Sequence, residues 1–517
     1  MQTCSHSSTF IPNTTVGNKP HLPWIVQKYG GTSVGKYLDT IATDIIPSYL
    51  EKNRVVIVCS ARSGKTKELG TTKRLLKAAE EALKEGSTIH LDIVKELTLD
   101  HMEVARQYIQ NQDILQQLES QLDRDCRRLR SFLQAAEIIQ EISPRSRDVI
   151  VGMGETLSCQ IVAALLKDKG IDSKFINLNN MIDKEFDNLN QEFYDYLATR
   201  LATIVEECGN KVPVLTGFFG NVPGSLLSTI GHGYTDLCAA LTAVGLHANE
   251  LHIWKEVDGI FTADPRKVEK ARLLPIITPE EVAELTYYGS EVIHPFTMEQ
   301  VIRVGIPIRI KNVENPAGSG TVIFPDLSSN KENNDSLPMS ILAQNGFHSD
   351  VSKRSPTAVT IKDNICVLNV HSNRKNVSHG FLANIFTTLD EHGIVVDLIS
   401  TSEVHVSMAL NAEMVSSSLD IAVNELAKHG SVDVMNNMAI LSLVGKHMKS
   451  TVGIAGNLFT ALANANISIE IISQGASEIN ISCVVDGSNA LEALNVVHEQ
   501  LLIVDPSIDH HLDSNKE

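Results

Sequence analysis

The sequence predicts an α/β protein in which a larger domain with a mostly parallel sheet precedes a duplicated smaller unit. Three observations support this prediction. Apolar runs alternate with helical periodicity between residues 23 and 325, glycine-bearing loops directly follow four of those runs, and a pattern of apolar residues and glycines repeats in the last 160 residues. Alternating strands and helices favour three layers, with helices on both faces of the sheet. Ligands of such sheets bind where the strands end.

The expected elements of the first domain follow in chain order. Residues 1–22 are polar and are expected to form a flexible tail. Continuous apolar runs are typical of strands that are buried on both faces, and residues 71–141 carry a long helical periodicity, interpreted as a helical insert. The segment 148–166 is expected to begin as a strand or turn and to continue as a helix. Strands are expected at WIVQKY (24–29), RVVIVCSA (54–61), KVPVLTG (211–217), ELHIWKEV (250–257) and IPIRIKNV (306–313).

The C-terminal part contains an internal repeat, preceded by a polar segment that we interpret as a linker. Ile365–Val370 aligns with Met438–Leu443 at an offset of 73, which also superposes Gly380 on Gly453. Each copy has the element order of a ferredoxin-like unit: a strand, a glycine-started helix, two strands and a helix. The pair is either a dimerisation module or a ligand-binding regulatory pair. The expected boundaries are 23–325 for the first domain, 326–357 for the linker, and 358–435 and 436–510 for the two copies.

Composition argues against several classes of protein. The 44 basic and 62 acidic residues give a formal net charge of −18, whereas nucleic-acid-binding proteins need a basic footprint. The eight cysteines are scattered without a CxxC pair, which disfavours a disulfide framework or a zinc site and favours a reducing, cytoplasmic environment. The N-terminal segment does not have the form of a signal peptide, and no apolar run approaches the ~20 residues that span a bilayer.

A glycine-rich loop follows the first expected strand. The run GGTSVGK nearly fits a P-loop, but Tyr37 stands where that motif needs Ser or Thr to hold Mg²⁺, so we reject a P-loop NTPase. In KYGGTS, a lysine at the strand end can reach a transferred phosphoryl group, the glycines free backbone N–H groups for phosphate oxygens, and the hydroxyl residues cap a helix. An ordinary strand–turn–helix corner has the same local pattern. The residues concerned are Lys28, Gly30, Gly31, Thr32 and Ser33.

Further acidic residues stand in glycine-bearing segments. VDGIFTADPR contains Asp258, Asp264 and Arg266, which suit nucleotide and phosphate contacts but also suit a solvated turn. Glu155 in GMGETLS and Asp236 in GHGYTDL stand at expected helix starts, where the helix dipole favours an acid. The functional alternatives are that Glu155 binds a substrate ammonium group and that Asp236 orients an acceptor carboxylate or a cation.

Together these motifs resemble those of aspartate kinases. The resemblance is carried by KYGGTSV, GMGETLS, GYTDLCAAL, WKEVDGIFTADPR, TYYGSEVIHP, SHGFLANIF and VDLISTSE, and it runs from about Trp24 to near the C-terminus. The helical insert and WKEVDGIFTADPRKV are most similar to the fungal, monofunctional branch. The resemblance implies an amino-acid-kinase fold followed by two ACT domains. It also implies ATP-dependent phosphorylation of L-aspartate to 4-phospho-L-aspartate, on the route to threonine, methionine and isoleucine.

The same resemblance implies cofactors, an effector and residue roles. ATP and a Mg²⁺ ion held mostly by water and phosphate are expected, with inhibition by L-threonine and a homodimer or higher homo-oligomer formed through the ACT domains. Lys28 and Asp236 are the expected catalytic residues. The nucleotide is expected to contact Lys28, Gly30, Gly31, Thr32, Ser33, Trp254, Lys255, Glu256, Asp258, Gly259, Asp264, Arg266 and Arg272. Aspartate is expected to contact Thr66, Glu155, Thr216, Phe218 and His232, and the effector Ser378, Gly380, Phe381, Leu382, Asp397, Ser402 and Glu403.

One residue departs from the family pattern. The loop before Asp236 usually contains Gly-Arg-Gly, whereas this chain has Gly231-His232-Gly233. An imidazole cannot reproduce the planar fork with which arginine holds a carboxylate, and losing that pair costs ~1.5–3 kcal/mol, or roughly ten- to a hundredfold in affinity. We therefore expect a weakened aspartate site that improves at lower pH, where the imidazole is charged. For His232 itself, the alternative is a loop histidine without effect on binding. For the whole protein, the alternative functions are a kinase of another amino acid or of carbamate, and a catalytically impaired amino-acid sensor.

Overall fold

The computed structural model describes most of the chain from residue 15 onward. The described residues are 15–64, 69–220, 222–288, 293–324, 356–372, 380–402, 404–415, 418–428, 430–446, 448, 451–475 and 479–503, except for the side chains of residues 232, 414 and 415. The chain divides into two compact units, residues 1–259 with 293–325 and residues 260–292 with 326–517. The sequence analysis assigns 260–292 to the first domain, so the division differs there. The expected linker, 326–357, lies almost wholly outside the described residues.

The strands of the first unit form one sheet with the order β3-β4-β2-β1-β5-β7-β8. Neighbours from β3 to β7 are parallel, and β7 and β8 are antiparallel. This confirms the predicted mostly parallel sheet. β1 is buried at every residue, as expected for a strand covered on both faces. The strands are β1 Trp24–Tyr29, β2 Arg54–Cys59, β3 Ser173–Ile176, β4 Val212–Thr216, β5 Glu250–Lys255, β7 Ile308–Asn312 and β8 Thr321–Ile323.

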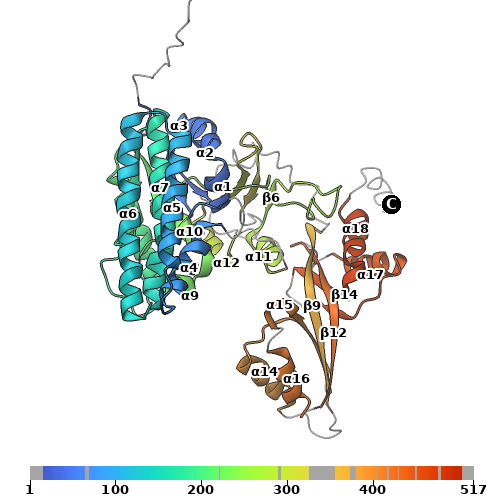
Figure 1. Cartoon of the computed structure of the whole chain (residues 1–517). Helices are drawn as coiled ribbons and strands as arrows, with labels where there is room; N and C mark the ends of the chain where they lie inside the picture. Colours follow the sequence, from blue (N-terminus) through green and yellow to red (C-terminus); the bar gives the residue numbers. More distant parts are fainter. Residues whose placement is uncertain are drawn as a thin grey trace, which may run out of the picture. The chain divides into compact units, whose positions relative to one another are not determined.

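Helices cover this sheet. α5, α6 and α7 lie side by side as long helices with roughly aligned axes (Figure 1), and the shorter α4 packs against all three. α7 contacts β2, β3 and β4. α10 contacts β1 and β5 and has α8 and α12 beside it. The predicted helical insert corresponds to α4, α5 and α6. The helices are α1 Gly31–Lys36, α2 Leu38–Thr40, η1 Ile41–Ile45, α3 Ile46–Leu50, α4 Thr71–Ala82, α5 Ile89–Tyr108, α6 Gln112–Ile139, α7 Pro144–Asp168, α8 Gln191–Glu206, α9 Leu226–Thr229, η2 Gly231–Gly233, α10 Tyr234–Gly245 and α12 Pro295–Ile302.

α7 differs from its predicted form. The sequence analysis expects a strand or turn at Asp148 and a helix start at Glu155, but both residues lie inside one continuous helix. The glycine at 152 serves close packing instead of a turn, because a Cβ added there would lie 2.6 Å from the Phe218 ring. α7 is long and apolar enough to cross a membrane, yet 94% of its most apolar window is buried inside the protein. That burial is typical of a core helix.

Residues 15–22 belong to the fold, and the prediction of a flexible tail is wrong for them. Asn18 is buried, and its Nδ2 donates to the carbonyls of Val55 and Lys211, each at 3.1 Å. Its Oδ1 accepts from the Val55 N–H at 2.7 Å. A polar residue with no apolar periodicity around it carries no local signal of such burial. Residues 1–14 lie outside the description.

The second unit contains one antiparallel sheet with the order β10-β11-β9-β12-β14-β13. The central strands β9 and β12 are each 15 residues long and pair with each other. Successive β9 residues alternate between the faces, so that Leu368 packs with α14 and α16 whereas Val367 packs with Tyr288. The elements are β6 Ile276–Ile277, α11 Pro279–Tyr287, β9 Ala358–Ser372, α14 Phe381–Glu391, β10 Val396–Thr401, β11 His405–Asn411, α15 Ala412–Val415, α16 Leu419–Leu426, β12 Gly430–Val444, α17 Ile454–Asn464, β13 Ile471–Ser473, β14 Asn480–Asp486, η5 Gly487–Asn489 and α18 Ala490–Leu501.

The internal repeat is visible in the backbone of this unit. Three pairs of residues at the predicted offset have positive φ angles, between 57° and 91°. Left-handed conformations are favourable for glycine and tolerated by asparagine, which explains the residue types. Two members of these pairs are the N-caps of α14 and α17, as the glycine-started helices predict. The pairs are Asn364 with Asn437, Gly380 with Gly453, and Gly393 with Asn466.

The two copies share their central strands, so they do not separate where the sequence boundary lies. Val359 and Ile361, at the start of β9, pack with Leu443 in the core of the second copy, although the boundary at 435 assigns them to the first. Ala263 and Val268, from the segment 260–292, join the same core. A continuous strand shows no break in its apolar pattern, and therefore this exchange between copies cannot be read from periodicity.

Candidate active site

Lys28, near the end of β1, forms an ion pair with Asp236 in the first turn of α10. Nζ and Oδ1 are 2.8 Å apart, and the side chains are 11% and 17% exposed. The two residues meet because α10 packs against β1. The two predicted catalytic residues therefore come together at one end of the sheet, where a parallel sheet binds its ligands.

The glycine loop passes beside this pair. A Cβ added to Gly30 would lie 3.9 Å from the Nζ of Lys28, and one added to Gly31 would lie 2.4 Å from the carbonyl oxygen of Ala61. Glycine at 31 is thus required by packing, and glycine at 30 leaves the space around the ammonium group open. The loop presents backbone next to a lysine, an arrangement that suits an anion such as phosphate.

Thr32 and Ser33 do not cap α1, contrary to the prediction. α1 begins at Gly31, and its N-cap residue, Gly30, makes no side-chain bond, so both hydroxyl residues lie within the first turn. Ser33 is buried, and its Oγ donates to Oε1 of Glu256 at 2.8 Å. Because β1 and β5 are neighbours, this bond ties the glycine loop to the segment that follows β5.

Glu155 lies in the middle of α7 and is 1% exposed. Its carboxylate accepts hydrogen bonds from the Phe218 backbone N–H and from the Thr235 hydroxyl, the latter at 2.8 Å. Burial raises the pKa of this carboxyl group to about 7. Lys28 is close enough to oppose this shift, but its ammonium is already paired with Asp236. An ammonium group on a ligand would supply the positive charge that Glu155 lacks.

Thr216 and Phe218 shape the wall beside Glu155. The Thr216 hydroxyl donates to the Phe218 carbonyl at 2.9 Å and accepts from the Leu178 N–H at 3.1 Å. Phe218 is buried, with its ring centroid 6.5 Å from that of Tyr234. The sequence analysis expects both residues to contact aspartate. In the structure the Thr216 hydroxyl is engaged within the fold, so this residue holds the loop after β4 in place.

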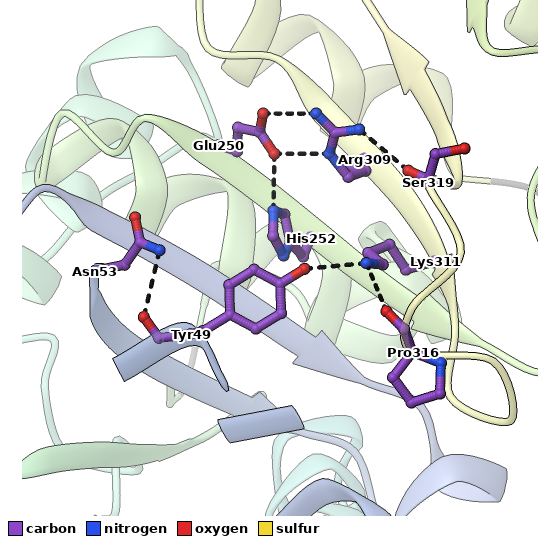
Figure 2. Close-up of polar contacts among 8 residues, drawn as sticks. All are labelled: Tyr49, Asn53, Glu250, His252, Arg309, Lys311, Pro316 and Ser319. Atoms are coloured by element: carbon purple, nitrogen blue, oxygen red, sulfur yellow. Dashed lines mark hydrogen bonds and ion pairs between the residues drawn. The ribbon is translucent and has the colours of Figure 1, made fainter. Parts of the chain in front are cut away.

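A charged network joins β5, which neighbours β1, to the next strand, β7. Figure 2 shows Glu250, on β5, accepting two hydrogen bonds from Arg309, each at 2.8 Å. His252 Nε2 lies 2.8 Å from the same carboxylate. Burial alone would raise the pKa of Glu250, but the hydrogen bonds from Arg309 and then His252 lower it well below its usual range. This carboxylate obtains its positive partner from the fold itself.

Trp254, predicted to line the nucleotide pocket, is instead a core residue. Its side chain is fully buried and stacks on Tyr29 with ring centroids 6.0 Å apart. Lys311 Nζ lies 5.2 Å from the indole ring and donates to the Tyr49 hydroxyl at 3.1 Å and to the Pro316 carbonyl at 2.9 Å (Figure 2). Burial lowers the pKa of Lys311 to about 8. The Trp254 side chain therefore packs inside the first unit, between Tyr29 of β1 and Lys311 of β7, and stabilises the end of β5.

The rest of the predicted nucleotide segment divides between the units. In the first unit Lys255 is the last residue of β5, and Glu256, Asp258 and Gly259 follow that strand. There Asp258 accepts hydrogen bonds from the amides of Asn312 and Asn315, at 3.2 Å and 3.0 Å.

Asp264, Arg266 and Arg272 belong to the second unit. Arg266 pairs with Asp264 at 2.8 Å, and its side chain is 88% exposed, as the alternative of a solvated turn describes. Arg272 Nη2 donates to the Leu502 carbonyl at 2.7 Å. Their contacts with phosphate stay predictions.

The predicted effector residues lie around the first copy of the repeat. Gly380 precedes α14, Phe381 is buried in the core of that copy, and Leu382 is 42% exposed. Asp397, on β10, pairs with Lys362 at 2.8 Å, and its side chain is 7% exposed. Ser402 follows β10. The described residues do not include the other two predicted effector residues, Ser378 and Glu403, nor, among the predicted aspartate contacts, Thr66 and the side chain of His232.

Sequence reasoning missed residues that hold the site together. Thr235 and Tyr234 both hydrogen-bond to Glu155, and their proximity to Asp236 in GYTDL was a usable signal. Asp148 accepts hydrogen bonds from the start of α9. Its signal was a spacing of seven residues from Glu155, which places both carboxylates on one face of a helix.

Comparison with known proteins agrees with this geometry. Residues 23–312 match the amino acid kinase family, and residues 441–501 match the ACT domain. The chain is 56% identical to the aspartokinase of Schizosaccharomyces pombe over 491 residues, covering 94% of each protein. It is 50% identical to the aspartokinase of Saccharomyces cerevisiae, covering 93% of each.

Solved structures show the same fold. The structure of E. coli aspartokinase III in complex with lysine and aspartate (T-state) matches with a TM-score of 0.72 at 25% identity, covering 92% of this chain and 99% of that one. The aspartate kinase of Clostridium acetobutylicum matches with a TM-score of 0.73 at 25% identity, covering 92% and 100%. With the site described above, these similarities show that the chain belongs to the aspartokinase family, the phosphotransferases that phosphorylate aspartate.

Proposed function

We propose that this chain transfers the terminal phosphoryl group of ATP to the side-chain carboxylate of L-aspartate, which forms 4-phospho-L-aspartate. The observation that carries the proposal is the meeting of Lys28 and Asp236 beside the glycine loop, with Glu155 near enough for the Lys28 charge to act on it. The aspartokinases among the relatives support the substrate. The product is the first intermediate on the route to threonine, methionine and isoleucine.

Charge stabilisation is the main task of the site in this reaction. A phosphoryl group in transfer spreads negative charge over its oxygens, and the protein contributes mostly positioning and electrostatics. Lys28 Nζ is partly desolvated and held by Asp236, so it stabilises that charge with little reorganisation. The backbone N–H groups of Gly30 and Gly31 bind the phosphate oxygens of the nucleotide.

ATP and Mg²⁺ are the proposed cofactors. In the part of the chain that the structure describes, no group of three or more His, Cys, Asp or Glu side chains could hold a metal ion. The ion would therefore be held mostly by nucleotide phosphates and water. Mg²⁺ supplies neutralisation of phosphate charge, while Lys28 and the 30–33 loop bind the phosphates.

The substrate is held at two ends. Glu155 binds the ammonium group of aspartate, which favours the ionised carboxylate against the desolvation that raises its pKa. The α-carboxylate binds at the 231–233 turn, where His232 replaces the arginine of the family pattern. The proposal therefore includes weak aspartate binding that improves as the imidazole becomes protonated.

Regulation by L-threonine is proposed for the second unit. The internal repeat and the ACT match over 441–501 support a ligand-binding regulatory pair, and the E. coli relative is described as a complex with lysine and aspartate in a T-state. The edge strands β10 and β13 favour a homo-oligomer formed by extension of this sheet. The scattered cysteines favour a cytoplasmic location.

The test is ADP release by the purified protein over a wide range of L-aspartate, with and without L-threonine. We expect turnover that needs high aspartate and is suppressed by threonine. Lys28→Met should lower kcat roughly a hundredfold or more, whereas Lys52→Met, at an exposed position, should not. No turnover at saturating aspartate, with threonine still bound, would instead support the impaired-sensor alternative. Equal use of L-glutamate would contradict the proposed substrate.

A further inference from the structure

A second buried carboxylate on α7 holds another part of the loop that Glu155 contacts. Asp148 is 1% exposed and accepts three hydrogen bonds at the start of α9. The donors are the Ser225 hydroxyl at 2.9 Å and the N–H groups of Leu226 and Leu227 at 2.6 Å and 3.3 Å. N–H groups at a helix start need acceptors, and here Asp148 supplies them together with the N-cap residue Ser225, whose hydroxyl accepts from the Ser228 N–H at 3.3 Å.

The charge of Asp148 is stabilised by this loop and not by a basic side chain. Within the described ranges, its carboxylate accepts hydrogen bonds only from residues 225–227 and forms no ion pair. The neighbouring Arg147 turns instead toward Glu80, at 3.7 Å. Leaving a buried carboxylate without its donors is costly. Asp148 and the start of α9 therefore hold each other in place.

Asp148 and Glu155 act on one loop from one helix face. They are seven residues apart on α7, which places them on the same side, about 10 Å apart along the axis. Glu155 accepts from Phe218 and Thr235, which precede and follow residues 225–227. The two carboxylates thus fasten the segment from 218 to 235 at three points.

The turn that carries residue 232 lies between the second and third of these points. α9 ends at Thr229, the turn η2 follows at 231–233, and α10 begins at once with Tyr234. Burial raises the pKa of Tyr234 well above its usual value, and the charges of Glu155 and then Asp148 add to this, so the phenol lies near both. A displacement of α9 would therefore move the turn relative to Asp236.

We propose that Asp148 is a positioning residue for the acceptor substrate, because by holding α9 it places the 231–233 turn against which the amino-acid carboxylate binds. This inference rests on the proposed function, which assigns the carboxylate to that turn. Asp148 acts through the turn and not on the reacting atoms. Its loss therefore raises the KM for L-aspartate more than it lowers kcat, and it leaves the KM for ATP unchanged.

The kinetic test compares Asp148→Asn and Ser225→Ala with a matched control. Asp148→Asn replaces one acceptor oxygen by an NH₂ group that faces the same donors, and we expect the KM for aspartate to rise about tenfold or more. Ser225→Ala removes one neutral donor to Asp148 and also the N-cap hydroxyl that accepts from the Ser228 N–H at 3.3 Å, and we expect a rise of roughly two- to fivefold. The control is Ser173→Ala, since the buried Ser173 hydroxyl also bonds to α7, at the Ala163 carbonyl, 2.6 Å away. The control should leave the KM for aspartate unchanged.

Hydrogen exchange of the full chain without substrate gives a second readout. We expect faster exchange of the amides in 225–233 in Asp148→Asn than in the wild type, and no change there in Ser173→Ala. Unchanged exchange in this segment, equal rises in both KM values, or a loss of kcat alone would overturn the inference. If Asp148→Asn does not fold, comparison of Ser225→Ala with Ser173→Ala decides whether the start of α9 places the turn, since the Ser225 hydroxyl bonds to both Asp148 and the Ser228 N–H. If the wild type does not phosphorylate aspartate, the proposed function fails, while exchange still decides whether Asp148 holds the turn.

Discussion

Glu155 and Glu250 are two glutamates of the first unit with opposite surroundings, the first fully buried and the second 13% exposed. Glu250 accepts hydrogen bonds from Arg309 and lies 2.8 Å from His252 Nε2, and these partners lower its pKa despite burial. Glu155 accepts from neutral groups, the Phe218 N–H and the Thr235 hydroxyl, and burial raises its pKa to about 7.

The difference separates a structural carboxylate from a binding one. At Glu250 the fold supplies the positive partner, so the charge contributes to stability whether or not a ligand is present. At Glu155 the fold supplies hydrogen-bond donors and the nearby charge of Lys28, which is itself paired with Asp236. A buried charge without a counter-charge of its own is costly. We infer that this cost is retained because an ammonium group completes the site when substrate binds. The two residues therefore predict opposite consequences of losing a charge.

The largest effect is expected for stability in Glu250→Gln. Removal of one partner of this largely buried pair, whose side chains are 12% and 13% exposed, leaves Arg309 uncompensated, so the free energy of unfolding should fall by about 3 kcal/mol, the lower end of the range for buried pairs. Urea denaturation followed by tryptophan fluorescence measures this, because both tryptophans, Trp24 and Trp254, lie in the first unit. The KM for aspartate should stay the same.

Asp172→Asn is the matched control for that substitution. Asp172 pairs with Lys211 at 3.6 Å, and the side chains are 40% and 50% exposed. Exposed pairs contribute ~0–1 kcal/mol. If Glu250→Gln loses no more stability than Asp172→Asn, the distinction between the two glutamates collapses.

Glu155→Gln should lower the affinity for aspartate about a hundredfold, because a charge-assisted contact with the ammonium group is lost. Initial rates over a range of aspartate measure the change, and the KM for ATP is the internal control. An unchanged KM for aspartate would show that the ammonium group binds elsewhere.

The same variant should remove a pH dependence of stability. The folded pKa of Glu155, about 7, exceeds the unfolded value of ~4.3, so the native state binds more protons between these values. Stability therefore falls as pH rises through this window, by about 3 kcal/mol for this group. Glu155→Gln should have a flatter profile between pH 5 and pH 8 and should unfold at higher urea than the wild type at pH 8. A profile as steep as that of the wild type would contradict the assignment.

His232→Arg should strengthen the other end of the substrate site. Restoring a planar fork for the carboxylate is expected to lower the KM for aspartate roughly ten- to a hundredfold, or ~1.5–3 kcal/mol. The gain should be larger at pH 8 than at pH 6, where the imidazole is partly charged. Equal KM values for the wild type and His232→Arg would sink the prediction and favour a harmless loop histidine.

The smallest effect is expected in the network around Glu250. Burial lowers the folded pKa of Lys311 to about 8, whereas an unfolded lysine titrates near ~10.4. The native state therefore releases this proton first, and stability rises with pH between these values. Between pH 8 and pH 10 the free energy of unfolding of Lys311→Met should increase by about 1 kcal/mol less than that of the wild type, after allowance for solvent screening. Parallel profiles would mean that Lys311 titrates normally.

Most of the secondary structure, and the positions of Lys28 and Asp236 at a strand end and a helix start, could be predicted from local pattern. Lys28 precedes a glycine loop that follows a strand, and Asp236 follows a glycine loop that opens a helix. In each case the glycines lie within a few residues of the charged residue, so the pattern is local. The repeat offset identified Gly380 and Gly453 as equivalent helix starts. The family resemblance assigns Trp254 to the nucleotide pocket, whereas its side chain is fully buried within β5 and stacks on Tyr29 of the neighbouring strand.

The sequence by itself determined the α/β class, the duplicated second unit and the residues that stand at strand ends, because those depend on periodicity and on backbone conformation over a few residues. Only the tertiary structure decided which charge each residue meets. Glu250 meets Arg309 because β5 and β7 are neighbours in register, and Asp148 meets Ser225 because α7 lies beside α9. Sheet order and helix packing join residues that are distant in the chain, and no local pattern encodes such a partner.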